Sequence, residues 1–434
     1  MDIAIIGLGK LGAPLAAVLA SSGHRVIGVD LDPRAVAAIN EGRAPVAEPG
    51  LQGCIDAAGD RLRATCDFAE AIAASALSYV IVPTPSGADG RFENHFVLDA
   101  VRRIGAALAG TDGYHVVNIA STMMPGSTGG EIRAALETAS GRRVGVDVGL
   151  CYSPEFIALG SVVHDLLHPD MVLIGQSDAR AGDAVEAVYR GILATVPSVR
   201  RMGWVDAEIT KIAVNTFVTT KISYANMLSE ICERLPGADV DVVTAALGMD
   251  SRIGPKYLRA ALGYGGPCFP RDNVALATLA SGLGVRADVA EATDAVNRRQ
   301  VGRVVALVRR LAGERAATIA VLGMAYKPDT PVVEESQGMM IARALAAAGH
   351  RVLIADPEAL DAAGAELGDA VTAFGSAAAA VMAAELVVIA TPARAFRDLP
   401  VAAFRGGKIV VDCWRILAVE VADVADLVYL GQGA

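Results

Sequence analysis

A glycine-rich turn near the start of the chain constrains its fold more than any other feature of the sequence. The pattern G-x-G-x-x-G occupies residues 7–12, directly after a β-branched run at residues 3–6, and an Ala/Leu-rich helical stretch follows it. A second apolar strand, expected at residues 24–30, ends on Asp30. In a strand–turn–helix–strand unit of this kind, the glycines permit a tight turn, close approach of a diphosphate and packing of helix on strand. The sequence therefore predicts a dinucleotide-binding unit here.

The same residues indicate which dinucleotide would bind. Its phosphates would lie at the helix N-terminus, where unpaired N–H groups and the helix dipole favour anions. Asp30 would accept hydrogen bonds from the adenosine ribose and repel a 2′-phosphate, which favours NAD over NADP, although nearby Arg34 weakens that preference. The alternative is a glycine turn that serves packing alone. The candidate cofactor-binding residues of this unit are Gly7, Gly9, Lys10, Leu11, Gly12, Asp30 and Arg34.

Strand and helix patterns alternate in both outer parts of the chain. In the first part, further strands are expected at residues 79–82, 116–120 and 171–174. The alternation restarts near residues 313–315, with strands expected at 318–322, 352–356, 386–390 and 409–412 and a helix at 336–348. Such alternation is typical of parallel sheets with helices on both faces.

The middle of the chain has a different pattern. Residues 206–235 contain neither Gly nor Pro and carry apolar residues at helical spacing, which predicts one long helix that either packs inside or forms a dimer interface. Further helices are expected at 240–247, 270–281 and 288–310. The predicted fold is α/β, with two doubly wound Rossmann-like domains joined by a long central helix and a helical middle region.

Charge and hydropathy exclude several classes of partner. Thirty-eight basic and 48 acidic residues give a net charge of −10, which argues against nucleic acid as a partner. Mean hydropathy is high, at +0.43. The longest uncharged run, residues 71–88, nevertheless contains two prolines and several Ser and Thr, so no membrane span is predicted. The six cysteines form no CxxC and no Cys/His cluster, so no metal site is predicted. The first residues lack the pattern of a signal peptide, which makes the cytoplasm the expected location.

One cysteine stands in a setting that suits catalysis. Cys268 follows a glycine-rich loop and precedes Pro270, which is well suited to the first turn of a helix. A thiol at a helix N-terminus has a lowered pKa, because the positive end of the helix favours the thiolate. Asp272 lies four residues further on, within reach of whatever Cys268 binds. The alternative is a buried structural cysteine in a Gly/Pro turn.

Polar residues also stand out on the predicted central helix and at strand ends. Glu208, Lys211 and Asn215 share one helical face, from which Lys211 and Asn215 could stabilise an oxyanion; a solvated polar stripe is the alternative. Residues 120–122 and 153–156 follow strands of the first domain, where open α/β sheets bind ligands. Lys327 and Arg415 follow strands of the last domain and could meet a phosphate or be surface bases.

These motifs, in this order, resemble the UDP-glucose/GDP-mannose dehydrogenase family over essentially the whole chain. The resemblance rests on the glycine turn, the cysteine loop and several short motifs between and after them. Those motifs are Val82-Pro83-Thr84-Pro85, Ser121-Thr122, Pro154-Glu155-Phe156, Lys211 to Asn215, Arg252-Ile253-Gly254-Pro255, Gly265 to Asp272 and Lys327-Pro328-Asp329-Thr330. The cysteine loop is the most specific of them.

The resemblance implies a division of the chain and a reaction. It implies an NAD-binding Rossmann domain at 1–203, a helical dimerisation region with the cysteine loop at 204–312 and a Rossmann-like UDP-binding domain at 313–434. The implied enzyme is a homodimer that oxidises the C6 alcohol of a nucleotide sugar to a carboxylate with two NAD. The Cys-Phe-Pro form of the loop favours UDP-glucose, while GDP-mannose and UDP-N-acetylhexosamines stay open.

Roles for individual residues follow from the same resemblance. Cys268 would be the nucleophile that forms a thiohemiacetal and then a thioester, with Lys211 and Asn215 stabilising the oxyanions. Asp272 and Glu155 would manage protons and the attacking water, and Thr122 would help hold that water. Thr84, Pro85 and Thr122 join the cofactor-binding residues. The implied substrate-binding residues are Phe156, Ile157, Lys211, Asn215, Arg252, Tyr257, Tyr264, Gly265, Phe269, Lys327 and Arg415, with Arg252 reaching the partner subunit's substrate.

The chain departs from the family pattern at four positions. Leu159 replaces a second acid, Glu334 replaces a cofactor-contacting arginine, Pro267 replaces a serine and Arg271 replaces a lysine. Two other classes share part of the pattern. A β-hydroxyacid or 6-phosphogluconate-type dehydrogenase would need neither Cys268 nor the last domain, and a non-catalytic nucleotide-sugar-binding protein would tolerate the departures.

Overall fold

The computed structural model describes residues 1–195, 197–313 and 315–433, and the boundary predicted at 313–315 includes Glu314, which lies outside them. The chain divides into two units, Met1–Ala213 and Val214–Ala434. One helix, α9 (Trp204–Cys232), contributes residues to both units and confirms the long helix expected in the middle of the sequence. Among the described residues, no helix has both the length and the apolar character needed to cross a bilayer.

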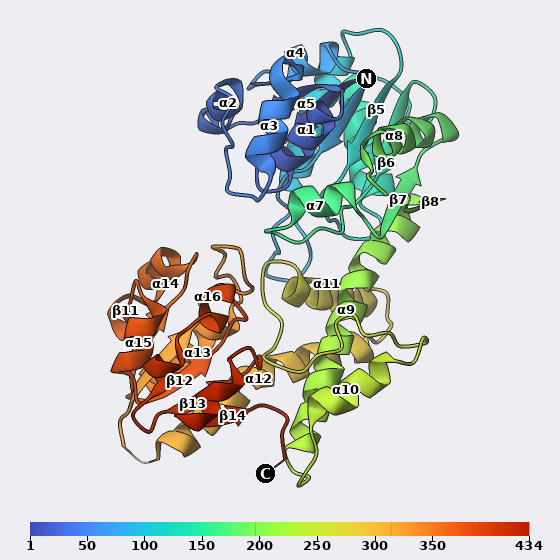
Figure 1. The fold of residues 1–434 in the computed structure, drawn as a ribbon. Helices are drawn as coiled ribbons and strands as arrows, with labels where there is room; N and C mark the ends of the chain where they lie inside the picture. The colour runs from blue at the N-terminus through green and yellow to red at the C-terminus, as the bar shows by residue number, and fades with distance from the viewer. Residues whose placement is uncertain (196, 314, 434) are drawn as a thin grey trace. The chain divides into compact units, whose positions relative to one another are not determined.

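The N-terminal unit is built on a sheet of strand order β3-β2-β1-β4-β5-β6-β7-β8 (Figure 1). Its strands are β1 (Asp2–Ile6), β2 (Arg25–Val29), β3 (Leu62–Thr65), β4 (Leu77–Val80), β5 (His115–Ile119), β6 (Val148–Tyr152), β7 (Met171–Gln176) and β8 (Ser198–Met202). Its helices before α9 are α1 (Gly12–Ser21), α2 (Pro33–Asn40), α3 (Leu51–Ala58), α4 (Phe68–Ala73), α5 (His95–Leu108), α6 (Arg133–Ser140), α7 (Val162–Leu167) and α8 (Ala179–Ile192).

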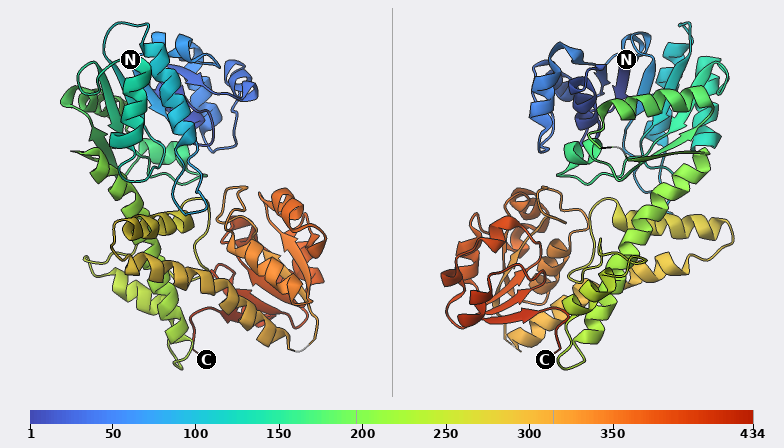
Figure 2. Two further views of the ribbon diagram at one scale, coloured as in Figure 1. Left: turned by 180° about the vertical axis from the view of Figure 1, so that it is seen from behind. Right: turned by 45° about the vertical axis from the view of Figure 1, so that its right-hand side comes forward.

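Both faces of this sheet are buried, because apolar residues fill alternate positions on each side of its strands. In β1, Ile3 and Ile5 join the core formed with α1, α3, α7 and α8, while Ala4 and Ile6 join the core formed with α4, α5 and α6. The view from behind brings α5 and α6 to the front (Figure 2). The helices therefore cover the sheet on two sides, as the alternating pattern predicts.

The strands are parallel except at one junction. Strand β7 runs antiparallel to β6, with Cys151 opposite Gln176 and Tyr152 opposite Gly175. The expectation of a wholly parallel sheet is therefore wrong there. The chain between these strands contains only the six-residue α7, and β7 then pairs in parallel with β8.

The C-terminal unit contains a second, fully parallel sheet of order β11-β10-β9-β12-β13-β14. Its strands are β9 (Thr318–Leu322), β10 (Arg351–Ala355), β11 (Thr372–Ala373), β12 (Leu386–Ile389), β13 (Ile409–Asp412) and β14 (Asp426–Tyr429). Besides the second part of α9, its helices are α10 (Val240–Gly248), α11 (Phe269–Gly282), α12 (Asp288–Ala312), α13 (Gln337–Ala347), α14 (Leu360–Leu367), α15 (Ala377–Ala383) and α16 (Arg394–Arg397).

The two sheets share one turn architecture. In the first, Asp30 Oδ2 accepts the N–H of Leu8 at 2.6 Å and its Oδ1 accepts the N–H of Asp32 at 2.8 Å. In the second, Asp356 Oδ2 accepts the N–H groups of Met324 and Ala325 at 2.6 and 3.0 Å. Each carboxylate thus ties the turn after the central strand to the end of the neighbouring strand.

A pair of glycines completes each turn. A Cβ on Gly12 would lie 1.8 Å from the carbonyl oxygen of Gly7, and one on Gly338 would lie 1.9 Å from that of Gly323. Gly7 and Gly323 both have positive φ, at 101° and 105°. Helix and turn can approach this closely only without a side chain, which is the packing role expected of the outer glycines.

A buried glutamate anchors the start of α9 within the N-terminal unit. Glu208 is fully buried, and its carboxylate accepts the N–H groups of Gly126 and Thr128 and the hydroxyl of Thr128 at 2.6, 2.8 and 2.6 Å. Burial raises the pKa of this carboxyl, while the three hydrogen bonds oppose that shift. Glu208 therefore fixes α9 on the loop after β5, which also fixes the placement of Lys211 one turn further on.

Asp356→Ala is expected to destabilise the C-terminal sheet domain by about 2–3 kcal/mol, because the buried N–H of Met324 loses its acceptor. Urea denaturation of the full chain measures this change. Glu358→Ala is the control, since Glu358 is exposed and donates only its backbone N–H to Asp356. Equal stability of the two variants would contradict the role assigned to the Asp356 carboxylate.

Candidate active site

The glycine turn of the N-terminal unit leaves room for a ligand at one position only. A Cβ on Gly7 or Gly12 would collide with backbone, whereas one on Gly9 would meet no atom within 4 Å. Nothing in the protein's own packing therefore requires a glycine at position 9. Open space beside exposed backbone at the start of α1 fits the close approach of a diphosphate, so these residues suit the dinucleotide predicted from sequence.

The other predicted cofactor residues surround this turn. Lys10 is exposed, and Leu11 is the half-buried N-cap residue of α1. Arg34 is exposed and forms an ion pair with Asp32 at 2.9 Å, so its charge is already balanced. Thr84, which precedes the half-buried Pro85, donates its hydroxyl to the carbonyl of Thr122 at 2.7 Å, and this bond joins the loops after β4 and β5.

A charged group forms at the start of α9 and the end of β6. Lys211 Nζ donates to the carbonyl oxygen of Glu155 at 2.7 Å and lies 4.7 Å from the centre of the Phe156 ring. The Glu155 carboxyl accepts the Tyr189 hydroxyl at 2.6 Å. Burial raises the pKa of Glu155 to about 7, although the Tyr189 hydrogen bond and the charge of Lys211 oppose the shift. A carboxyl group with this pKa can accept or donate a proton near neutral pH.

Neighbours of this group are apolar. Ile157 and Leu159 are half-buried and pack against the core that contains α1, α7 and α8. Leu159 therefore adds an apolar contact to this core and no charge.

The predicted cysteine loop lies in the C-terminal unit. Cys268 is exposed and is the N-cap residue of α11, and Pro270 occupies the first turn, as expected from sequence. Asp272 is 2% exposed, and its Oδ2 accepts the Asn215 side-chain N–H at 2.6 Å. Asn215, Cys268 and Asp272 are thus brought together by the second part of α9 and the start of α11.

Aromatic side chains pack together beside Cys268. The Phe269 ring meets the rings of Tyr257 and Tyr264 edge-on, with centroids 6.5 and 6.2 Å away. Asn273, which sequence reasoning missed, donates to the Thr219 hydroxyl at 2.9 Å and to the Tyr264 hydroxyl at 3.3 Å. These contacts hold the predicted substrate residues Tyr264 and Phe269 against α9.

The backbone of the loop rests on the segment that follows β9. A Cβ on Gly265 would lie 2.2 Å from the carbonyl oxygen of Glu335, and one on Gly266 would lie 2.5 Å from the Tyr326 ring. Gly266 also donates its N–H to the carbonyl of Glu334 at 3.1 Å. Glu334 therefore contributes its backbone carbonyl to the cysteine loop.

The remaining predicted substrate residues are placed as follows. Arg252 is exposed and pairs with Asp250 at 2.6 Å, on a loop whose next carbonyls accept from Lys221 of α9. Lys327 lies 6.0 Å from the ring centre of Tyr326. Arg415 has a positive φ of 50° and pairs with Asp239 at 2.8 Å and with Asp241 at 3.3 Å. A phosphate contact from Arg415 would therefore compete with two carboxylates, which sequence reasoning did not foresee.

The family follows from comparison with known proteins. Three models of the UDP-glucose/GDP-mannose dehydrogenase family match: the NAD binding domain at residues 1–193, the central domain at 205–299 and the UDP binding domain at 320–419. The chain belongs to the UDP-glucose/GDP-mannose dehydrogenase family. It is an NAD-dependent nucleotide-sugar 6-dehydrogenase, and the predictions of family, fold class and cofactor are confirmed.

Individual relatives in this family agree over most of their length. The chain is 38% identical to UDP-glucose 6-dehydrogenase AglM of Haloferax volcanii over 364 residues, which cover 83% of this chain and 84% of the relative. It is 34% identical to GDP-mannose 6-dehydrogenase of Pseudomonas putida, covering 82% and 81%. The structure of a UDP-glucose dehydrogenase from Pyrobaculum islandicum matches with a TM-score of 0.90 and 35% identity, covering 100% of this chain and 98% of that one.

Gly9→Ala is expected to leave stability within about 0.5 kcal/mol of wild type and to raise the KM for NAD at least about tenfold, because the new methyl fills the space for the diphosphate. Gly12→Ala is the matched variant: its methyl meets the Gly7 carbonyl, so a loss of about 1–3 kcal/mol in stability is expected. Thermal unfolding and NAD-dependent kinetics separate the two effects. An unchanged KM for NAD in Gly9→Ala would show that the phosphates lie elsewhere.

Proposed function

We propose that this chain oxidises UDP-glucose to UDP-glucuronate and consumes two NAD for each sugar. The observation that carries the chemistry is Cys268 at the N-terminus of α11, with Asp272 one turn further on and hydrogen-bonded to Asn215. An exposed thiol beside a buried acid and an amide donor suits covalent capture of an aldehyde. The relatives named for UDP-glucose support the choice of sugar, and the relative named for GDP-mannose supplies the competing one.

The proposed reaction uses the chain's own residues in two stages. In the first, the C6 alcohol loses its hydroxyl proton and a hydride from C6 and becomes an aldehyde, with Lys211 and Asn215 stabilising the developing oxyanion. In the second, the Cys268 thiolate adds to the aldehyde carbon to give a thiohemiacetal, and its oxidation leaves a thioester. NAD, when bound, accepts the hydride in each oxidation. Water then cleaves the thioester, which releases the carboxylate and restores the thiol.

Proton handling is assigned to the two carboxyl groups. Glu155, with its raised pKa, is proposed as the base that activates the hydrolytic water, which Thr122 helps to hold. Asp272 is proposed to exchange a proton near Cys268. The Gly7–Gly12 turn, Asp30 and the Thr84–Thr122 loops would hold NAD, while Phe156, Tyr264, Phe269 and Lys327 would contact the nucleotide sugar. These roles fit the local contacts described above.

We also propose that residues 1–203, 204–312 and 313–434 act as cofactor-binding, dimerising and nucleotide-binding parts. A homodimer through α9 is supported by the unusual surface of this helix. Phe217, Tyr224 and Ile231 are 68%, 47% and 48% exposed and recur every seven residues. Such an exposed apolar stripe at heptad spacing is typical of a helix covered by a partner.

We propose the cytoplasm as the location of the protein. All six cysteines are free thiols, which suits that reducing compartment.

The stoichiometry of NADH tests the reaction and the sugar together. UDP-glucose is expected to give two NADH per sugar at 340 nm, and GDP-mannose and UDP-N-acetylglucosamine are expected to give little or none. A single NADH per sugar would mean that the reaction stops at the aldehyde. Two NADH per GDP-mannose would show that GDP-mannose, and not UDP-glucose, is the substrate.

Cys268→Ser is expected to abolish net acid formation, because no thioester can form. Full two-NADH turnover in that variant would contradict the covalent mechanism.

Tyr224→Glu is expected to shift the protein from dimer to monomer in analytical ultracentrifugation, because it places a charge in the centre of the apolar stripe. Arg102→Glu serves as the control, since Arg102 is exposed on α5 and lies away from α9 in the sequence. A Tyr224→Glu protein that sediments like wild type would rule out the α9 interface.

A further inference from the structure

A tyrosine from α8 lies against the carboxyl group to which we assign the hydrolytic step. Tyr189 is 4% exposed, and its hydroxyl donates to Glu155 Oε1 at 2.6 Å, across 34 positions of sequence. The two side chains line one pocket with Pro154, Phe156, Asp165 and Met171. A short hydrogen bond of this kind from a buried donor fixes the position of the carboxyl group and favours its ionised form.

We propose that Tyr189 is a positioning residue for Glu155: its hydroxyl holds the carboxyl group in place and stabilises the carboxylate form that activates water. The proposal rests on the base role given to Glu155 under the proposed function. Tyr189 is buried, and its hydroxyl already donates its hydrogen bond to Glu155. We therefore assign it no direct contact with the nucleotide sugar, and its effect is exerted through Glu155. No feature of the sequence marks it, since it lies at a core-facing position of an ordinary amphipathic helix.

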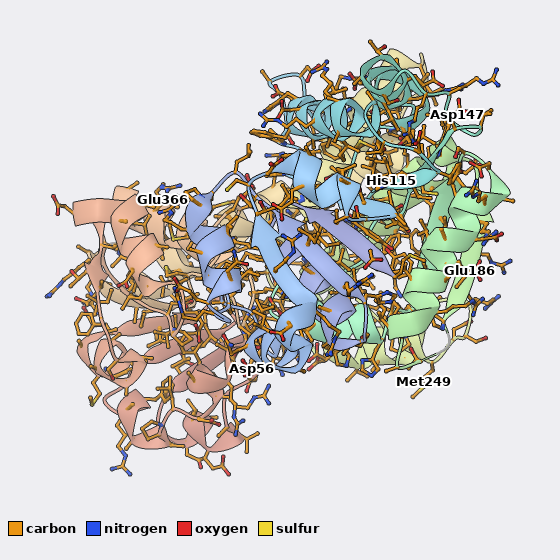
Figure 3. The ribbon with its side chains drawn as sticks, turned by 90° about the horizontal axis from the view of Figure 1, so that it is seen from above. Asp56, His115, Asp147, Glu186, Met249 and Glu366 are labelled. Atoms are coloured by element: carbon orange, nitrogen blue, oxygen red, sulfur yellow. The ribbon has the colours of Figure 1, made fainter. Side chains whose placement is uncertain are left out.

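The charged groups around Glu155 show why a hydrogen bond from Tyr189 matters for its carboxylate form. Lys211 from α9 is the cation whose charge favours the Glu155 carboxylate, and its Nζ bonds the Glu155 backbone carbonyl. Asp165 from α7 lines the same pocket, and it accepts hydrogen bonds from the Ala158 N–H and the Ser161 hydroxyl. On α8, Glu186 lies on the outer side and is held by Arg190 and Arg201 (Figure 3). The Tyr189 hydroxyl is therefore the neutral donor that offsets the desolvation of Glu155.

A second buried tyrosine supplies a matched control. Tyr79 of β4 is 1% exposed, and its ring meets that of Tyr189 edge-on with centroids 6.3 Å apart. Within the described residues, its hydroxyl has no hydrogen-bond partner. Removing either hydroxyl takes one oxygen from the same apolar core, but only the Tyr189 change takes a donor from Glu155.

The test is the pH dependence of kcat with UDP-glucose for wild type, Tyr189→Phe, Tyr79→Phe and Glu155→Gln. Loss of the Tyr189 donor raises the pKa of Glu155, so the acidic limb of Tyr189→Phe is expected to move about one unit to higher pH. At pH 7 its kcat is then about fivefold below wild type and at pH 9 nearly equal to it, with the KM for the sugar unchanged. Tyr79→Phe is expected to follow the wild-type profile.

The outcomes separate the two assignments. Loss of the acidic limb in Glu155→Gln, together with the shifted limb in Tyr189→Phe, supports both. A Glu155→Gln protein that loses the limb, beside a Tyr189→Phe protein that falls equally at every pH or matches Tyr79→Phe, overturns the role of Tyr189 and leaves Glu155 as the base. Retention of the limb in Glu155→Gln removes the proposed base, and Tyr189 falls with it. Thermal unfolding of each variant confirms that the profiles compare folded proteins.

Discussion

In each of the two sheet domains, one aspartate organises the fold by accepting hydrogen bonds from a neighbouring turn. The turn after a central parallel strand exposes backbone N–H groups that have no partner in the sheet, and a carboxylate at the end of the next strand accepts them. Asp30 does this for Leu8, and Asp356 does it for Met324 and Ala325. Charge-assisted bonds of this type are among the stronger ones in proteins. The start of the following helix, the contact between the two glycines and the ligand edge of the sheet all depend on the turn that they hold.

Two buried carboxyl groups of the N-terminal unit, those of Glu208 and Glu155, differ in the number of hydrogen bonds that they accept. Glu208 accepts three hydrogen bonds from one loop, so its carboxylate stabilises the backbone of that loop. Glu155 has the Tyr189 hydroxyl as its hydrogen-bond donor and keeps a pKa near neutrality. This difference in the number of donors fits the anchoring role of Glu208 and the role of base proposed for Glu155. Glu208 precedes Lys211 by three residues on α9, and Lys211 Nζ donates to the backbone carbonyl of Glu155. The start of α9 is therefore linked to both acids.

The sequence predicted those features that depend on nearby residues. The glycine turn with Asp30, the 29-residue α9 and the position of Cys268 at a helix start all follow from local patterns, and the structure contains each of them. Long-range pairing is different in kind. The bond of Tyr189 to Glu155 and the pairing of Arg415 with Asp239, 176 positions apart, depend on where the fold places two distant side chains. The reversed direction of β7 depends on the path of a connection rather than on the apolar pattern of the strand, which is the same in either direction.

The two sheet domains make the same glycine contact with connecting segments of different length. Gly12 follows Gly7 by five positions, and Gly338 follows Gly323 by fifteen, yet both pairs make the same contact and both turns are tied by the same kind of aspartate. The contact between the glycines is the constant part, and the chain between them is the variable part. The length of chain between the two glycines can therefore differ without disturbing the sheet, because the contact on which helix and strand pack does not depend on it. The longer loop of the C-terminal domain carries Tyr326 and Lys327, so the extra chain adds side chains at the ligand edge while the core beneath it keeps the same packing.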